Sequence, residues 1–352
     1  MSRLLDQSGG MTYAEAGVSI EAGDEAVERI KAVVASTKRP EVLGGIGGFG
    51  GLFALDVAQF KAPVLVSSAD GVGTKLEVAR QVGRYDSVGI DLVAMLVDDL
   101  ACIGAEPLFL LDYVAVGKLD PSVLEQLVGG IAEGCRQANT ALLGGETAEH
   151  GGVMKDDDLD VAGFTVGVVE RGTEMGPERL RAGDVLIGLA SPGLRSNGYT
   201  LARKVLVTSP DDLRRPAWDG AERTLGDELL VPSVIYAPTI TALRESLGEG
   251  VHAAAHITGG GITGNVVRIL TSDLDAHIQM ESFETPQIFF EIQRRGSISA
   301  EEMVRVFNCG LGMVVAVNPS VVEQALTIAA AQGQTATVVG TVEPGTGKVV
   351  LS

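Results

Sequence analysis

Residues 87–117 read SVGIDLVAMLVDDLACIGAEPLFLLDYVAVG, and this stretch decides the class of fold. Its first part, 87–103, spaces apolar residues like a helix, and 107–117 has the apolar character of a strand. The alternation continues in both directions along the chain. It predicts strands at 63–68, 140–145, 160–170 and 184–191, helices at 26–34, 75–82 and 121–138, and a strand-turn-helix unit at 251–270. The fold class is therefore α/β or α+β.

Three aspartates lie inside the apolar helix predicted at 87–103. Acidic side chains in such a setting need a partner. Asp91 and Asp98 are seven residues apart and share a helix face. Asp99 lies about 80° round the helix from Asp91, at roughly 100° per residue. The alternative is a solvated acidic stripe, which is common in a chain this acidic.

Length and composition limit the possible functions. The 352 residues, 45% of them hydrophobic, suffice for two cores, and the polar segment 170–184 predicts domains at 1–172 and 173–352. The net charge of −19 opposes nucleic-acid binding, which requires a basic surface. No apolar stretch approaches the ~18 residues of a membrane span. Three cysteines without a CxxC pair predict a reducing cytoplasm rather than a disulfide framework or zinc site.

Residues 44–51 read GGIGGFGG, with six glycines in eight positions. The segment matches neither of the common glycine-rich nucleotide fingerprints. Glycine lets backbone N–H groups approach phosphate oxygens closely. A flexible loop without a ligand is the alternative, and the pattern alone leaves both open. Phe49 and Phe53 favour a flap that packs against a neighbour.

Two further motifs place charged groups after predicted strands. ADGVGTK at 69–75 offers Asp70 for a metal ion and Lys75 for nucleotide phosphate. Its alternative is an ordinary Asp-Gly turn with a solvent-facing lysine. GGETAE at 144–149 places Glu146 and Thr147 after another strand. We expect carboxylates from several strand ends to converge on one edge, as a multi-metal nucleotide site requires.

Two turns in the second half contain candidate substrate-binding residues. RSNGY at 195–199 places Asn197 where a helix opens, which suits anion capture but also a plain N-cap. His256 precedes TGGG and is one of four histidines, and a lone histidine is more often structural than catalytic. Together with the motifs of the first half, these turns predict an enzyme that uses a nucleotide, phosphate groups and magnesium.

The chain resembles the phosphoribosylformylglycinamidine cyclo-ligase family, also called the aminoimidazole ribonucleotide synthetase family. The matching stretches run in family order from Tyr13 to Met313; they are YAEAGVSIEAGDEAVERIK, RPEVLGGIGGFGG, DGVGTK, GIDLVAMLVDDL, GAEPLFLLDYVAVGKL, GGETAE, DVAGFTVGVVE, SNGY, HITGGGI and FNCGLGM. The resemblance implies a two-domain fold in which the N-terminal sheets of two subunits pair into a barrel across a homodimer. We expect 63–68 and 109–117 to form apolar edge strands that the second copy covers.

The resemblance also implies the reaction. Formylglycinamidine ribonucleotide and ATP, with Mg²⁺, would give 5-aminoimidazole ribonucleotide, ADP and phosphate in de novo purine biosynthesis. This chemistry requires positioning and charge neutralisation more than a protein nucleophile. The sequence shows no convincing nucleophile–base pair, in agreement with that requirement.

The family's roles transfer to matching positions of this chain. Nucleotide binding falls on Gly44, Gly45, Gly47, Gly48, Gly50, Gly51, Asp70, Lys75, Gly145, Glu146 and Thr147. Metal binding falls on Asp70 and Asp99, and substrate contact at the catalytic centre on Asn197 and His256. On this basis Asp99→Asn should lose most activity, whereas Asp98→Asn should stay close to wild type.

The chain departs from the family pattern in two places. Arg195 stands where the family usually has His, and arginine cannot act as an acid or base near neutral pH. Residues 150–154 read HGGVM, where the family has an MPGMY-like segment. Both departures affect the surroundings of the substrate site implied by the resemblance.

Two other functions are alternatives to the cyclo-ligase reaction. One is another enzyme of the same superfamily, such as formylglycinamidine synthetase, a thiamine-phosphate kinase or a selenophosphate synthetase. The synthetase is much longer or has a glutaminase partner, and the two smaller enzymes lack the DGVGTK and GGETAE pair. The other is a non-catalytic nucleotide-binding regulator, which would not need several carboxylates around the phosphates.

Overall fold

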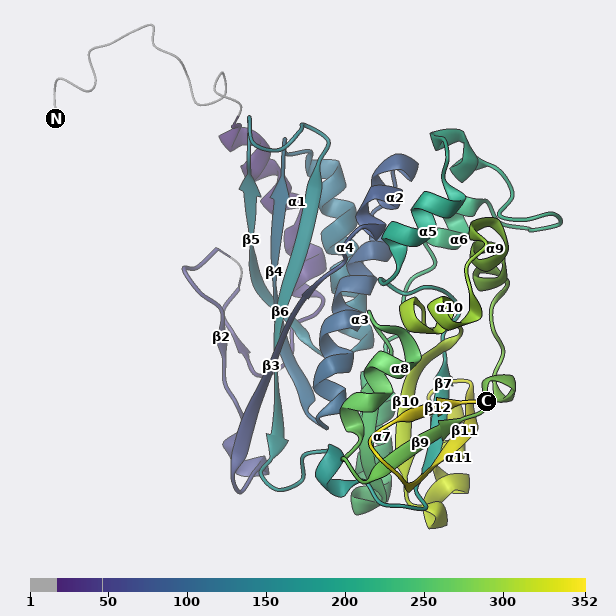
Figure 1. Cartoon of the computed structure of the whole chain (residues 1–352). Coiled ribbons are helices and arrows are strands. Elements are labelled where there is room, and N and C mark those ends of the chain that lie inside the picture. The colour runs from purple at the N-terminus through teal and green to yellow at the C-terminus, as the bar shows by residue number, and fades with distance from the viewer. Residues whose placement is uncertain (1–17, 46) are drawn as a thin grey trace, which may run out of the picture.

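The computed structural model describes residues 18–45 and 47–352 (Figure 1). Residues 13–17 of the first family-like stretch and Ile46 of the glycine segment lie outside the described residues. The first half contains α1 (Ile20–Ala35), β1 (Val42–Leu43), β2 (Leu52–Phe53), β3 (Pro63–Gly71), α2 (Lys75–Val82), α3 (Asp86–Cys102), β4 (Glu106–Val116), α4 (Pro121–Gln137), β5 (Ala141–Glu149) and β6 (Leu159–Glu170).

The second half begins after a polar segment at 171–184. It contains β7 (Val185–Ala190), α5 (Tyr199–Leu206), α6 (Leu225–Leu229), α7 (Ala237–Leu247), β8 (Val251–His256), α8 (Gly261–Val266), β9 (Leu274–Ile278), α9 (Gln287–Gly296), α10 (Ala300–Val306), β10 (Leu311–Val317), α11 (Val322–Ala331), β11 (Ala336–Pro344) and β12 (Val349–Leu351). The mixed α/β class and most predicted elements are thereby confirmed. Within the described residues, no helix is long and apolar enough to cross a membrane.

The N-terminal sheet has the strand order β3-β6-β4-β5. β4 and β5 are parallel, while β6 runs antiparallel to both of its neighbours. In Figure 1, α3 and α4 cover one face, and the opposite face carries the β1–β2 hairpin but none of the described helices. β3 is an edge strand, as expected. The expectation that 109–117 is also an edge was wrong, because β4 pairs with β6 and β5 on its two sides.

The helix α3 is the central element of the first half. Thirteen of its 17 residues are buried, including Asp91 and Asp98. It packs closely on α4, and glycine makes this approach possible. A Cβ atom on Gly130 of α4 would lie 1.8 Å from the backbone oxygen of Asp86. Such close contact fixes the rotation of α3 about its axis, and with it the direction of each aspartate.

The C-terminal sheet has the order β12-β9-β11-β7-β10-β8. All seven residues of β10 are buried, so this strand forms the centre of the second core. β8 is paired antiparallel to β10 at the edge of the sheet, with His256 opposite Met313. His256 therefore ends a strand that lies next to α3 of the first half.

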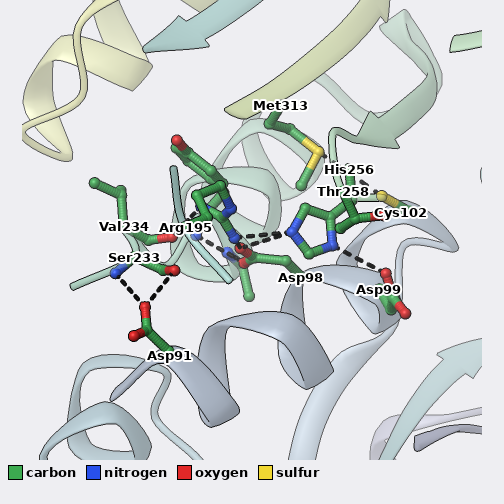
Figure 2. Close-up of polar contacts among 12 residues, drawn as sticks. Asp91, Asp98, Asp99, Cys102, Arg195, Ser233, Val234, His256, Thr258 and Met313 are labelled. Atoms are coloured by element: carbon green, nitrogen blue, oxygen red, sulfur yellow. Dashed lines mark hydrogen bonds and ion pairs between the residues drawn. The ribbon is translucent and has the colours of Figure 1, made fainter. Parts of the chain in front are cut away.

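The two halves are joined through buried ion pairs on α3. Lys75 Nζ lies 2.5 Å from Asp91 Oδ2, and both side chains are completely buried. Asp91 Oδ1 accepts hydrogen bonds from the backbone N–H and the hydroxyl of Ser233, at 2.8 and 2.6 Å (Figure 2). The lysine also donates to the backbone oxygens of Arg195 and Val231. One pair therefore holds two segments of the second half against the first.

The second pair lies two turns further along α3. Arg195 Nη2 donates to Asp98 Oδ2 at 2.8 Å. Asp98 Oδ1 accepts from the backbone N–H groups of Tyr236 and Ala237, at 2.7 and 2.9 Å. Asp98 thus satisfies N–H groups at the start of α7, which have no partner within their own helix. The Asp91–Asp98 face of α3 meets the second half of the chain rather than solvent.

Candidate functional site

A pocket of about 310 Å³ lies where β3 and α3 meet the second half of the chain; we call it the interdomain pocket. Its polar lining residues are Ser67, Ser68, Asp99, His256, Asn265 and Arg268. They come from β3, α3, β8, α8 and the 3₁₀ turn Val267–Ile269. Tertiary structure therefore brings together groups from Ser67 to Arg268 that are far apart in sequence.

Asp99 is the aspartate of α3 that faces this pocket. Its side chain is 42% exposed, whereas those of Asp91 and Asp98 are fully buried. Ser68 Oγ donates to Asp99 Oδ2 at 3.1 Å, and His256 Nδ1 lies 2.9 Å from Asp99 Oδ1. Burial opposes ionisation, but the contacts with His256 and Ser68 outweigh it and lower the pKa of Asp99. The carboxylate is therefore ionised near neutral pH.

Asp70 follows Ser68 by two residues on β3, so both side chains lie on the same face of the strand. Burial raises the pKa of Asp70, and the negative charge of Asp99 raises it further. A cation between the two carboxylates would remove this repulsion. Within residues 18–45 and 47–352, no cluster of three His, Cys, Asp or Glu side chains is arranged to hold a metal. Two carboxylates fit Mg²⁺, which in nucleotide sites uses one or two, with phosphates and water completing its shell.

Asn197 lies at the turn before α5, close to the TGGG turn. A Cβ atom on Gly259 would be 3.6 Å from Asn197 Nδ2. Asn197 Oδ1 and the Ser196 hydroxyl are buried, and neither has a hydrogen-bond partner among the described residues. Buried polar atoms usually have partners, so two unsatisfied atoms on one turn indicate a place for a polar ligand.

A second pocket of about 320 Å³ lies between α1, α4 and β5; we call it the α1 pocket. It is lined mainly by apolar side chains, together with Gly145, Glu146, Thr147, Glu149 and Asp112. Asp112 and Gly145 are paired across β4 and β5. A Cβ atom on Gly145 would lie 1.7 Å from Asp112 Oδ1, so only glycine leaves room for this carboxyl group. Burial raises the pKa of Asp112 to about 7.

A third pocket of about 280 Å³ adjoins the C-terminal end of α1; we call it the glycine pocket. Gly44, Gly45 and Gly51 line it together with Lys31 and Lys38. It shares the lining residues Val34 and Leu142 with the α1 pocket, so the two hollows are neighbours. Gly47, Gly48 and Gly50 belong to the same hairpin loop between β1 and β2 but do not line this pocket.

The structure does not place Lys75 as the sequence predicts. Its ammonium group is paired with the Asp91 carboxylate and donates hydrogen bonds to the backbone oxygens of Arg195 and Val231. Lys75 lines none of the three pockets described above. It joins the two halves of the chain and does not reach a phosphate site.

The expected convergence of carboxylates on one sheet edge is also not observed. Asp70 lies on β3 and Glu146 on β5, which form opposite edges of the N-terminal sheet with β6 and β4 between them. β3 and β5 run in the same direction, so both residues lie toward the same end of the sheet. Within one chain, the interdomain pocket and the α1 pocket are therefore separate.

Sequence reasoning missed Asp112 as a pocket residue and the buried position of Arg195. Asp112 was visible as the one charge inside the apolar run 107–117, opposite a predicted glycine-rich strand. Arg195 was noticed only as a departure from a family pattern, and its contact with Asp98 spans 97 positions in sequence. Nothing in the local sequence indicates such a contact.

Comparisons with known proteins support the interpretation of the whole chain. Residues 56–169 match the family model described as AIR synthase related protein, N-terminal domain, and residues 181–352 match the C-terminal domain of the same description. A curated phosphoribosylformylglycinamidine cyclo-ligase of Anaeromyxobacter dehalogenans is 52% identical over 336 residues. The match covers 95% of this chain and 96% of that protein.

Solved structures share the fold at much lower identity. A thiamine-monophosphate kinase from Stenotrophomonas maltophilia has a TM-score of 0.69 at 20% identity, with 93% of this chain and 96% of that chain covered. The hydrogenase maturation protein HypE in complex with ATP has a TM-score of 0.64 at 16% identity, with 92% and 90% covered. At these identities, the likeness concerns the fold alone.

The two adjacent aspartates of α3 should respond differently to substitution. Asp98→Asn leaves the buried Arg195 without a countercharge, which should cost about 3–5 kcal/mol of unfolding free energy. Asp99→Asn should change stability by less than about 1 kcal/mol, because its carboxylate is partly exposed. The contrast replaces the expectation that Asp98→Asn resembles wild type. Urea unfolding of both variants measures it, and equal midpoints would contradict the assignment of Asp98 to the buried contact.

Asp112 should make the stability of the ligand-free protein depend on pH. Its folded pKa of about 7 lies above the unfolded value of about 3.9, so the folded state keeps a proton that the unfolded state loses. Stability from this group is complete below about pH 4 and is lost as the pH rises through about 7. Wild type should therefore lose more thermal stability than Asp112→Asn between about pH 5.5 and 8.5. Parallel melting curves across this range would show that Asp112 titrates normally.

Proposed function

Because the chain belongs to the phosphoribosylformylglycinamidine cyclo-ligase family, we propose that it converts formylglycinamidine ribonucleotide and ATP to 5-aminoimidazole ribonucleotide, ADP and phosphate. The observation that carries this conclusion is the high identity to a curated enzyme of that name along nearly the whole of both chains. The reaction belongs to de novo purine biosynthesis, and we place it in the cytoplasm.

The α1 pocket and the glycine pocket suit ATP. The first is mainly apolar, and its carboxyl residues are Asp112, Glu146 and Glu149. The half-buried Asp112 can exchange a hydrogen bond with the amino edge of a purine. The second offers flexible backbone and the ammonium groups of Lys31 and Lys38, which suit phosphate. Gly145, Glu146 and Thr147 line the first pocket, and Gly44, Gly45 and Gly51 line the second, so this proposal keeps most of the nucleotide residues expected from sequence.

Asp70 and Asp99 would hold the magnesium ion. When bound, Mg²⁺ neutralises charge on phosphate oxygens during transfer. Ser68 and His256 hold the carboxylate of Asp99 in one orientation, and the contact with His256 keeps it ionised. In this proposal the orientation of Asp99 is already set by its two contacts before the metal binds.

The turn at 195–197 and the TGGG turn are proposed to hold the ribonucleotide substrate. Asn197 Oδ1 and the Ser196 hydroxyl are buried without a hydrogen-bond partner among the described residues, and both lie on the turn between β7 and α5. His256 lines the adjacent pocket. Ring closure joins two atoms of one substrate, so the chain accelerates it chiefly by fixing their relative position.

We further propose that the enzyme is a homodimer, with the N-terminal sheets of two copies pairing into a barrel. The helix-free face of the sheet exposes Leu65, Phe164 and Tyr113 by 62%, 49% and 37%. The strand register places these side chains on the same face. Exposed apolar side chains on one sheet face, bounded by two open edges, mark an interaction surface. In the proposed barrel, a second copy covers both the face and the edges.

Turnover tests the proposed reaction directly. Purified protein should release ADP and phosphate in the presence of formylglycinamidine ribonucleotide and magnesium, with aminoimidazole ribonucleotide formed in equal amount. Asp99→Asn should lower kcat/KM by about 10- to 100-fold, because one carboxylate of the metal pair is removed. Efficient ATP turnover with thiamine phosphate or selenide, and none with the ribonucleotide, would refute the proposal.

Sedimentation tests the dimer. Wild type at micromolar concentration should sediment as a dimer, and Phe164→Glu should shift it to monomer by placing charge in the proposed barrel. Val338→Glu is the matched control, because Val338 is 39% exposed on β11 of the other sheet. A fully active wild-type monomer would disprove the dimer.

A further inference from the structure

Arg195 is fully buried at the junction of the two halves, and its backbone has a left-handed φ of 64°. Nη1 donates to the backbone oxygen of Val234 at 2.7 Å, and Nη2 donates to Asp98 Oδ2 at 2.8 Å. Nη2 also lies 2.8 Å from His256 Nε2, and the guanidinium stacks 4.8 Å from the Tyr236 ring centre. Figure 2 shows the arginine between Asp98 and His256. The planar guanidinium of Arg195 is thus fixed by contacts with four different residues.

The contact with His256 determines which ring nitrogen carries hydrogen. A guanidinium has donors and no acceptor, so Nε2 must accept from Arg195. A hydrogen on Nε2 would point at another hydrogen, and it has no alternative partner there. Asp98 Oδ2 is 3.9 Å from Nε2, which is beyond hydrogen-bond distance. The ring hydrogen is therefore on Nδ1, where Asp99 Oδ1 accepts it at 2.9 Å.

We propose that Arg195 is a positioning residue that fixes His256 as the Nδ1–H tautomer and thereby orients Asp99 toward the interdomain pocket. Four side chains form one line of contacts, in the order Asp98, Arg195, His256 and Asp99. The first member is anchored by two backbone N–H groups at the start of α7, those of Tyr236 and Ala237. The last member is the partly exposed carboxylate of the pocket.

The same contacts define what His256 does. Because Arg195 occupies Nε2, this nitrogen does not take a proton from a substrate. His256 acts instead by donating from Nδ1 to Asp99. Hydrogen bonds to such ring nitrogens fix tautomer and orientation in many sites where histidine supports a charged group. The assignment of Asp99 to magnesium rests on the proposed function, but the tautomer does not.

Nitrogen-15 NMR of the histidine rings tests the tautomer without substrate. The chain has four histidines, and a His256→Gln spectrum identifies the signals of His256 by their absence. In wild type near neutral pH, Nδ1 should give the signal of a hydrogen-bearing nitrogen and Nε2 that of an unprotonated one. Hydrogen on Nε2, alone or together with Nδ1, would overturn the proposal. This outcome would leave the proposed reaction untouched.

Two variants test whether Arg195 acts on the His256 ring through its hydrogen-bond donors or only by filling space. Arg195→Lys keeps a donor-only cation, so the Nδ1–H tautomer should persist. Arg195→Met combined with Asp98→Asn removes the donor without leaving a buried charge unpaired. Nε2 should then become free to carry hydrogen, while Asp99 still accepts from Nδ1. If the ring spectrum of the double variant matches wild type, Arg195 does not set the tautomer.

The magnesium dependence of the folded variants gives the functional counterpart. The double variant should need about 10- to 100-fold more magnesium for half-maximal turnover, as is usual when a residue that orients a metal ligand is removed. Arg195→Lys should recover most of this loss. An unchanged magnesium requirement in the double variant, despite a changed tautomer, would contradict the orientation of Asp99 through His256.

Discussion

The rest of the structure depends on where the aspartates of one buried helix find their partners. Asp91 and Asp98 of α3 carry charge into a region from which water is excluded, and each is paired and hydrogen-bonded there. A buried charge without such partners would be too costly to retain. The partners come from α2, the turn before α5 and the loop before α7. The contacts that neutralise the two buried aspartates of α3 are therefore the same contacts that hold the two halves of the chain together.

Asp99 differs because it is one position further along the helix. A step of roughly 100° turns its carboxylate away from the buried face and toward the interdomain pocket. It keeps partial exposure, and its pKa falls through its contacts with His256 and Ser68. The buried Asp98–Arg195 pair lies directly behind this site. A buried structural contact and a carboxylate that faces the pocket thus come from neighbouring residues of a single turn.

In the glycine-rich strand β5, at the other edge of the sheet, a missing side chain makes room for a pocket residue on the neighbouring strand. Gly145 leaves space for Asp112 on the neighbouring strand, so the absence of a side chain is required for the presence of a carboxyl group in the α1 pocket. Asp112 lies beside apolar side chains, and burial raises its pKa to about 7. The two strands together place this carboxyl group beside the apolar side chains of α1 and α4 that line the same pocket.

Sequence by itself determined the types of elements, the order of the two halves and the residues that carry charge into apolar segments. Apolar spacing, glycine turns and caps act over a few residues, so α3, β3, β4 and β6 could be predicted from their own positions. Even the shared face of Asp91 and Asp98 followed from helical geometry.

Only the tertiary structure decided what each charged group contacts. Lys75 looked suited to phosphate, yet packing placed its ammonium beside Asp91 and two backbone oxygens. Strand order put Asp70 and Glu146 on opposite edges, because β6, which follows β5 in sequence, pairs between β3 and β4. The rotation of a helix about its axis and the order of strands in a sheet are set by contacts between segments far apart in sequence. A local sequence pattern therefore cannot predict either of them.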